Sequence, residues 1–147
     1  MSIISLPEFA DKLNEVMPVL MREFTRMQPA EIYKGKVTLP QIIILQHLIS
    51  QEPVKMTDIA NFMKVTTAAA TGIIERLVKS GYVIRVFDQD DRRIVKIKIN
   101  SKGLELMKKL ANERRKMVIN IFSKISEQDR QDYLRILMRI KEVLSGE

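Results

Sequence analysis

Residues Tyr82–Gly103 read YVIRVFDQDDRRIVKIKINSKG and are the most informative part of the sequence. Within it, two β-like runs, Tyr82–Phe87 and Ile94–Ile99, flank a loop that is rich in charge. The second run alternates apolar residues with Lys96 and Lys98, which is the period of a half-buried strand. We therefore predict a β-hairpin that projects from its domain. Arginines near its tip can contact phosphate or enter a minor groove.

The preceding segment, Lys55–Gly81, predicts two short helices joined by a tight turn. The first helix ends near Lys64–Val65, and Thr66 then stands where a helix N-cap belongs. Gly81 follows the second helix, as a glycine just beyond a helix C-terminus commonly does. The second helix has an apolar face made of Ala70, Ile73, Ile74 and Leu77, and an opposite face made of Thr67, Ala68, Thr71, Gly72, Glu75, Arg76 and Lys79.

Small outward residues allow a helix to enter a major groove, where hydroxyls and an arginine can reach base edges or phosphates. Two helices, a tight turn and a basic hairpin follow one another in the order of a winged helix-turn-helix. The chain resembles the MarR family of transcriptional regulators over nearly its whole length, most specifically from residue 57 to 103. The resemblance rests on TTAAATGIIERLVKSGYV (residues 66–83), Asp91-x-Arg93, and Ile99-Asn100-x-x-Gly103.

The family usually has Leu-Thr where this chain has Ile99-Asn100, and asparagine serves equally well as an N-cap. The resemblance implies a mainly α fold with a small β-hairpin wing, that is, a winged helix-turn-helix with long N- and C-terminal dimerisation helices. We expect a single domain over residues 1–147, with the winged lobe at about 38–100. The dimerisation helices are then expected at about 1–30 and 101–147.

The flanking segments carry apolar stripes at helical spacing, which need a partner surface. We predict a helix over Leu6–Gln28, kinked or briefly broken at Pro18. The remaining predicted features are a loop over Pro29–Val37, a helix from the capping box Thr38–Gln41 through Ile49, a long helix capped by Asn100, and a further helix start at Ser126-x-x-Asp129. The resemblance implies a homodimer with interdigitating termini, and a two-fold dimer matches a pseudo-palindromic operator.

Eight residues are candidates for contact with double-stranded DNA: Thr66, Thr67, Ala68, Thr71, Arg76, Asp91, Arg92 and Arg93. The resemblance implies that Arg93 enters the minor groove and that Asp91 braces the wing through an ion pair. Thr66 is first of all a helix cap. Asp88 and Asp90 should repel phosphate, so only the arginine side of the tip is expected to face DNA. The alternatives are an ordinary solvated helix face and an exposed charge cluster that contributes little.

Gly72 lies inside the second predicted helix, where glycine costs about 1 kcal/mol relative to alanine. Close approach to DNA and tight packing against a neighbouring helix account for it equally well. His47, the one histidine, reads as an ordinary surface or core residue rather than a ligand.

The composition of the chain further limits the classes of function that it can have. The 147 residues carry a net charge of +7, and the excess lies outside residues 1–50, which suits attraction to nucleic acid. The chain has no cysteine, which excludes disulfides, thiol-based sensing and cysteine zinc sites. We expect no metal and no cofactor. No apolar run is long enough to span a bilayer and no signal segment is apparent, so we expect a cytoplasmic protein without membrane contact.

Three classes of function are compared. An enzyme is disfavoured, because the chain lacks a P-loop, a GxGxxG motif, an HExxH motif and a nucleophile–histidine set. A winged-helix module that binds protein rather than DNA is the alternative. The favoured interpretation is a DNA-binding transcriptional regulator, with repression and release by a small-molecule effector implied by the family.

Overall fold

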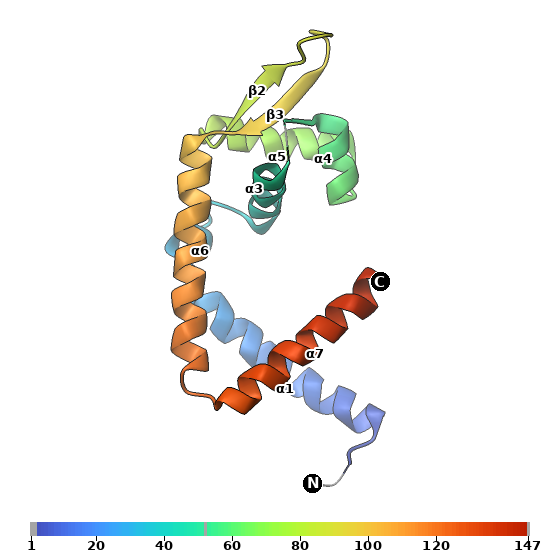
Figure 1. Cartoon of the computed structure of the whole chain (residues 1–147), viewed down its shortest axis with the longest axis vertical. Coiled ribbons are helices and arrows are strands. Elements are labelled where there is room, and N and C mark those ends of the chain that lie inside the picture. The colour runs from blue at the N-terminus through green and yellow to red at the C-terminus, as the bar shows by residue number, and fades with distance from the viewer. Residues whose placement is uncertain (1–2, 52, 147) are drawn as a thin grey trace. The chain divides into compact units, whose positions relative to one another are not determined.

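The computed structural model describes residues 3–51 and 53–146, most of them helical (Figure 1). The helices are α1 (Leu6–Arg26), α2 (Ala30–Tyr33), α3 (Leu39–Ser50), α4 (Met56–Met63), α5 (Thr67–Lys79), α6 (Ser101–Phe122) and α7 (Glu127–Ser145). The strands are β1 (Val54–Lys55), β2 (Val83–Phe87) and β3 (Val95–Ile99). This order confirms the mainly α fold with a β-hairpin wing.

The chain forms two compact units, Met1–Ala111 and Asn112–Glu147. The first unit contains the winged helix-turn-helix. The expected limits of the winged lobe and of the dimerisation helices stay predictions.

The core of the first unit joins the helices to the sheet. Ile44 and Leu45 of α3 are fully buried, as are Ile74 and Leu77 of α5 and Ile97 of β3. On α6, the buried side chains include Leu106, Met107 and Leu110. Leu104 on the same helix is exposed, so Leu106 rather than Leu104 fills the core.

The sheet has three antiparallel strands in the order β1-β3-β2. The predicted hairpin is confirmed, with each strand starting one residue later than expected. In β1, Val54 lies opposite Ile97 and Lys55 lies opposite Lys96. Lys55 was expected to begin a helix, and β1 was not predicted, because a two-residue strand has no periodicity to detect.

Two features of the N-terminal segment differ from what was expected. α1 is one continuous helix across Pro18, so the expected brief break is wrong, while a kink at Pro18 stays a prediction. A proline removes one backbone donor, and this helix buries none of its residues, so water can satisfy the freed carbonyl. The segment expected to be a loop holds the single turn of α2. Glu31 of α2 accepts a hydrogen bond from Lys109 of α6, which holds the pKa of that carboxyl below its usual value.

Helix starts follow the predicted caps. Thr38 Oγ1 accepts the backbone N–H of Gln41, whose side chain accepts the N–H of Thr38 in return. In the second unit, Ser126 Oγ accepts the N–H of Asp129 at 3.1 Å and opens α7. The rings of Phe122 and Tyr133 lie 5.4 Å apart between α6 and α7.

None of the helices in the described ranges combines the length and apolar character needed to cross a membrane.

Candidate nucleic-acid interface

The turn between α4 and α5 is closed by backbone geometry. Lys64 adopts the left-handed conformation, with φ of 54°. Val65 donates its N–H to the carbonyl oxygen of Ala60 at 3.1 Å. Thr66 then caps α5, since its hydroxyl oxygen accepts the N–H of Ala69 at 3.1 Å. The predicted break and the predicted cap are both confirmed.

Helix α5 divides into a buried and an outward face, as predicted. Ala70, Ile74 and Leu77 are buried, and Ile73 packs partly against the core. Outward candidates differ in what they can offer. Thr66, Thr67, Ala68 and Arg76 are exposed, whereas Thr71 is half-buried. Because the Thr71 hydroxyl donates to the carbonyl oxygen of Thr67 at 2.8 Å, it faces a partner mainly as an acceptor.

Gly72 has open space where a side chain would stand. A Cβ added there would meet no heavy atom within 4 Å beyond the helix's own backbone. Tight packing against a neighbouring helix therefore does not explain this glycine, and that alternative is wrong. Close approach to DNA stays a prediction.

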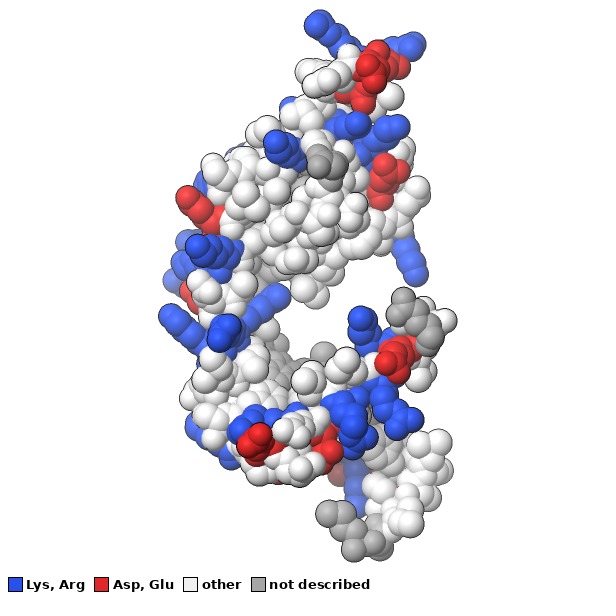
Figure 2. All heavy atoms as spheres, viewed as in Figure 1, with Lys and Arg blue, Asp and Glu red and all other residues white. Residues whose placement is uncertain are grey.

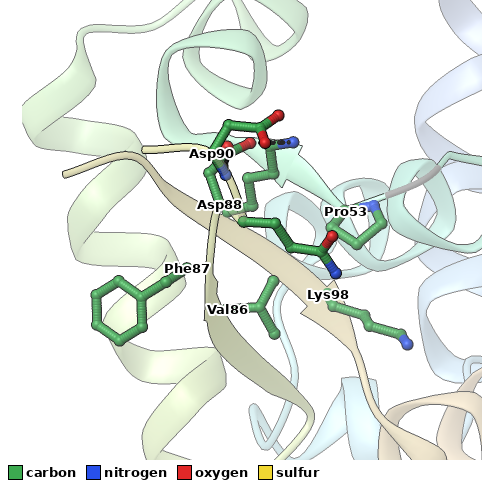
Figure 3. Close-up of a pocket in the computed structure, with 8 residues that line it drawn as sticks. Pro53, Val86, Phe87, Asp88, Asp90 and Lys98 are labelled. Atoms are coloured by element: carbon green, nitrogen blue, oxygen red, sulfur yellow. Dashed lines mark hydrogen bonds and ion pairs between the residues drawn. The ribbon is translucent and has the colours of Figure 1, made fainter. Parts of the chain in front are cut away.

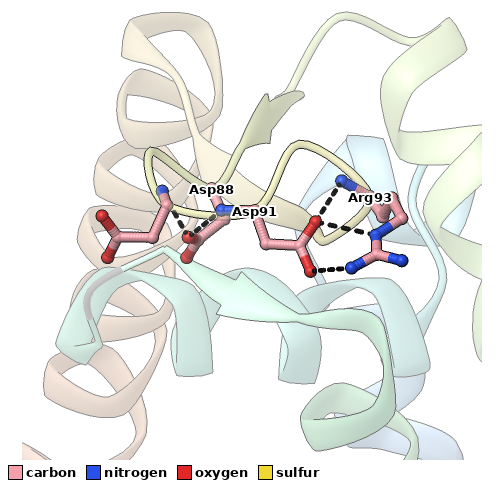
Figure 4. Close-up of polar contacts among 4 residues, drawn as sticks. Asp88, Asp91 and Arg93 are labelled. Carbon is pink, nitrogen blue, oxygen red and sulfur yellow. Dashed lines mark hydrogen bonds and ion pairs between the residues drawn. The ribbon is translucent and has the colours of Figure 1, made fainter.

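The wing loop is organised by two aspartates (Figure 4). Asp91 holds Arg93 through three hydrogen bonds, at 3.0 Å to the backbone N–H, 3.1 Å to Nε and 3.2 Å to Nη2. The ion pair implied for these residues is therefore present. The Arg93 hydrogen bonds lower the pKa of the Asp91 carboxyl. Nine-tenths of the Arg93 side chain stays exposed, and Nη1 remains directed away from the carboxylate.

Asp88 has a structural role that sequence reasoning missed. One oxygen accepts the backbone N–H groups of Asp90 and Asp91 at 2.9 and 3.1 Å, while the other forms an ion pair with Lys96. The Lys96 hydrogen bond and the two backbone donors lower the pKa of Asp88 to about 2. Asp88 is thus neutralised locally rather than presented to phosphate. The sequence signal that could have revealed this role is an aspartate at the start of a turn, where the side chain commonly accepts backbone N–H groups of the following residues.

The remaining charges of the tip face solvent. Figure 2 shows Lys and Arg side chains on both sides of an acidic group at the tip. Arg92 and Asp90 are exposed. On the outer face of the hairpin, Val86, Asp88, Lys96 and Lys98 line a hollow together with Pro53 of the turn before β1 (Figure 3).

The start of α6 is hydrogen-bonded to the residues that follow α5. Asn100 Nδ2 donates to the carbonyl oxygen of Gly81 at 2.6 Å, and its Oδ1 accepts the N–H of Gly103 at 2.9 Å, which confirms the predicted cap. Lys102 Nζ donates to the carbonyl oxygen of Ser80 at 2.8 Å. A Cβ at Gly103 would overlap the carbonyl oxygen of Tyr82. The end of α5, the base of the wing and the start of α6 are therefore joined in one place.

The described residues contain no group of histidine or acidic side chains suited to a metal ion. His47 is half-buried, with its ring stacked on Phe62 at 3.9 Å, as an ordinary packing histidine would be.

Comparisons with known proteins agree on one family. The model described as "MarR family" matches residues 37–95. The HTH-type transcriptional repressor MdtR of Bacillus subtilis is 24% identical over 124 residues, which are 82% of this chain and 80% of MdtR.

Solved structures share the fold. A MarR family protein from Bacillus stearothermophilus gives a TM-score of 0.76 at 19% identity, covering 97% of this chain and 99% of that one. A mutant of S. aureus MepR bound to an oligodeoxyribonucleotide gives 0.66 at 18% identity, covering 92% and 97%.

Proposed function

Since this chain belongs to the MarR family of winged helix-turn-helix transcriptional regulators, we propose that it represses transcription in the cytoplasm by binding operator DNA as a homodimer. The family consists of DNA-binding regulators rather than enzymes. The observation that carries the proposal is the pairing of two exposed elements in one unit. The capped, slim N-terminus of α5 is open to solvent, and β2, which contacts α5, leads into an arginine-bearing wing.

In the proposed complex, the N-terminal turn of α5 lies in the major groove. Thr67 and Ala68 offer short side chains for close approach, and Arg76, one helical turn from Gly72, reaches phosphate. Arg93 enters the adjacent minor groove through the outer edge of its guanidinium, while Asp91 holds the group in a fixed orientation. The alignment of a fixed guanidinium suits a narrow, negatively charged groove.

The dimer is supported by apolar surface that each terminal helix leaves uncovered. Helix α1 buries none of its residues, and Phe9, Val16 and Leu20 are about half exposed. Helix α7 likewise buries none, and Val143 and Leu144 are each 81% exposed. Continuous apolar faces of this kind mark interaction surfaces. We assign the partner as a second copy of the chain, because a closed two-fold dimer covers identical faces.

A two-fold dimer presents two recognition helices, so the operator is pseudo-palindromic with half-sites about one helical turn apart. Repression follows if the occupied site overlaps a promoter. A small-molecule effector releases the operator by binding more tightly to a dimer whose recognition helices are wrongly spaced. Such release requires differential affinity of the ligand for the two states.

Selection of bound sites from a pool of random-sequence duplex DNA tests the proposal. The full-length protein should enrich a pseudo-palindrome, and its affinity for the enriched duplex should fall steeply with salt. Sedimentation of the complex should give two chains per duplex. If the pure protein enriches no sequence and shows no salt-dependent binding to a random duplex, it is the protein-binding module considered above.

A further inference from the structure

The aromatic side chain nearest the wing loop points into solvent. Phe87, the last residue of β2, is 67% exposed, which is more than any other aromatic side chain whose burial the structure describes. A phenyl group this exposed gains little from burial against the described residues. It pairs across the hairpin only with Val95, the first residue of β3.

The register of the hairpin shows which way Phe87 faces. Because side chains alternate along a strand, Phe87 shares its face with Val83, which is buried, and with Arg85. Opposite them lie Val95, Ile97 and Ile99, and the last two belong to the core. These residues form the face of the hairpin that packs on the helices. Phe87 lies on this face beyond the edge of the core. Figure 3 shows the phenyl ring directed away from Lys98 and Pro53.

Two guanidinium groups accompany the phenyl ring. Arg85 lies two residues earlier on the same face, and Arg92 borders the same hollow as Phe87, about 550 Å³ in volume. Both arginines are exposed. Within residues 3–51 and 53–146, neither side chain forms an ion pair or hydrogen bond, in contrast to Arg93, which Asp91 holds.

We propose that Arg85, Phe87 and Arg92 form a second DNA-backbone contact, in which the phenyl ring packs on deoxyribose while the two guanidiniums contact the flanking phosphates. The proposal rests on the DNA-binding function proposed above. A duplex that receives α5 in its major groove and the wing tip in its minor groove runs past the helix-facing side of the hairpin. The sugar–phosphate wall between those grooves alternates apolar sugars with anionic phosphates, and this surface likewise combines a phenyl ring with two cations. Asp88 also borders the hollow, but its carboxylate is paired with Lys96.

The partner chemistry follows from this composition. An acidic peptide would satisfy the arginines but leave the ring uncovered, whereas deoxyribose presents C–H edges to it. The contact reads no bases, so it adds affinity and fixes the position of the wing without adding sequence information.

The wing base is already rigid before DNA arrives. Asp88 donates its N–H to the carbonyl oxygen of Ile94 at 3.0 Å, immediately after Phe87. The Asp88 carboxylate then fixes the next two peptide groups. The ring is therefore carried by a backbone that needs no ordering on binding.

Salt dependence separates the two parts of the contact. The duplex enriched by the full-length protein serves as the probe. Phe87→Ala should weaken binding about tenfold, which corresponds to losing roughly 55 Å² of apolar contact, and should leave the slope of log affinity against log salt unchanged. Arg85→Ala should lower the steepness of that slope by about one. Ile84→Ala, on the opposite face of the same strand, is the matched control and should change neither.

The absence of tryptophan from the chain allows a direct probe. In a Phe87→Trp variant, the single indole should be shielded from acrylamide quenching when the duplex binds. The indole of an Ile84→Trp variant should be quenched equally with and without DNA. Thermal melting confirms that each variant is folded.

Unchanged affinity of Phe87→Ala, a changed salt slope in that variant, or an unshielded indole at position 87 would overturn the inference while leaving the proposed function intact. Failure of the wild-type protein to bind any duplex would instead overturn the proposed function itself.

Discussion

The Asp88 carboxylate lies 2.8 Å from the Lys96 ammonium across the base of the wing loop. The same carboxylate accepts two backbone N–H groups of the loop. A residue that first appears to be an unwanted negative charge near phosphate is therefore the group around which the loop folds.

Replacing Asp88 tests this role. Asp88→Ala should weaken operator binding several-fold, although it removes a negative charge, because two backbone donors and Lys96 lose their acceptor. Asp88→Asn should retain more affinity, since its carbonyl oxygen can still accept both N–H groups. Binding of both variants to the enriched duplex at two salt concentrations is the measurement. Tighter binding by Asp88→Ala would mean that the charge matters more than the loop.

The pH dependence of stability should carry the signature of the same residue. The pKa of Asp88 is lowered to about 2 from an ordinary value of 3.8. A lowered carboxyl pKa contributes stability that is fully present above the ordinary value and is lost as the pH falls through the folded value. The stability difference between wild type and Asp88→Asn should therefore be constant above about pH 5 and shrink toward pH 2. Urea unfolding across this range measures it.

Arg93 and Asp91 should act together. Arg93→Ala should weaken operator binding roughly tenfold to a hundredfold, the range of a well-placed contact. Arg93→Lys should not restore it, because an ammonium lacks the planar group that suits a narrow groove. Asp91→Ala should also weaken binding, since Arg93 loses three hydrogen bonds that orient it.

Whether Asp91→Ala lowers or raises the operator affinity decides between two interpretations of Asp91. A merely solvated acid near phosphate would strengthen binding when deleted. Operator titrations of all three variants, with melting curves to exclude unfolding, provide the test. Tighter binding by Asp91→Ala together with unaffected binding by Arg93→Ala would remove the wing tip from the interface.

Gly72→Ala should separate stability from binding. The space for a methyl group is open, so the substitution should stabilise the fold by about 1 kcal/mol, the helix preference of alanine over glycine. Operator affinity should fall, because the added methyl group stands where DNA approaches. Denaturant unfolding and operator titration of one protein preparation give both values. A stabilised variant with unchanged affinity would place Gly72 outside the DNA contact.

Assembly should depend on α7. Removal of residues 126–147 should leave aggregated or unfolded protein, as judged by light scattering and circular dichroism. The reason is that the proposed dimer would lose one of the two apolar terminal helices that support it. A well-folded monomer after this truncation would contradict the proposed dimer.

A point substitution tests the proposed dimer without removing a helix. Ile140 is about half exposed within an apolar patch of α7 that includes Ile136 and Val143. Ile140→Glu should shift the protein toward monomer in sedimentation. Gln131→Glu, nine positions earlier and on the opposite side of the same helix, should leave the assembly unchanged.

The features that could be predicted from the sequence depend on interactions between residues close together in the chain. The caps at Thr66, Asn100 and Ser126 were predictable because each side chain accepts an N–H only three residues ahead. The hairpin was predictable from the alternation of its second strand. The Asp91–Arg93 pair came from the family motif rather than from any local rule.

The features that escaped prediction depend on distant partners. β1 exists because Val54 and Lys55 meet β3 more than 40 positions later, and two residues alone carry no strand signal. The turn of α2 is tied to α6 through Glu31 and Lys109. Arg85 and Phe87 were read only as part of a strand, since their exposure follows from where the core ends rather than from the sequence pattern.

The hydrogen bonds of Asn100 and Lys102 to the carbonyl groups that follow α5 couple α5 to the first turn of α6. Gly103 lies too close to the carbonyl oxygen of Tyr82 to carry a side chain, and Asn100 and Lys102 donate to the carbonyl oxygens of Gly81 and Ser80 just after α5. A movement of the first turn of α6 should therefore be transmitted to the C-terminal end of α5. A small tilt at this point displaces the opposite end of α5 most, which is the end proposed to enter the major groove. How far a movement of α6 displaces the proposed DNA-contacting end of α5 is thus set by three residues outside the proposed contact.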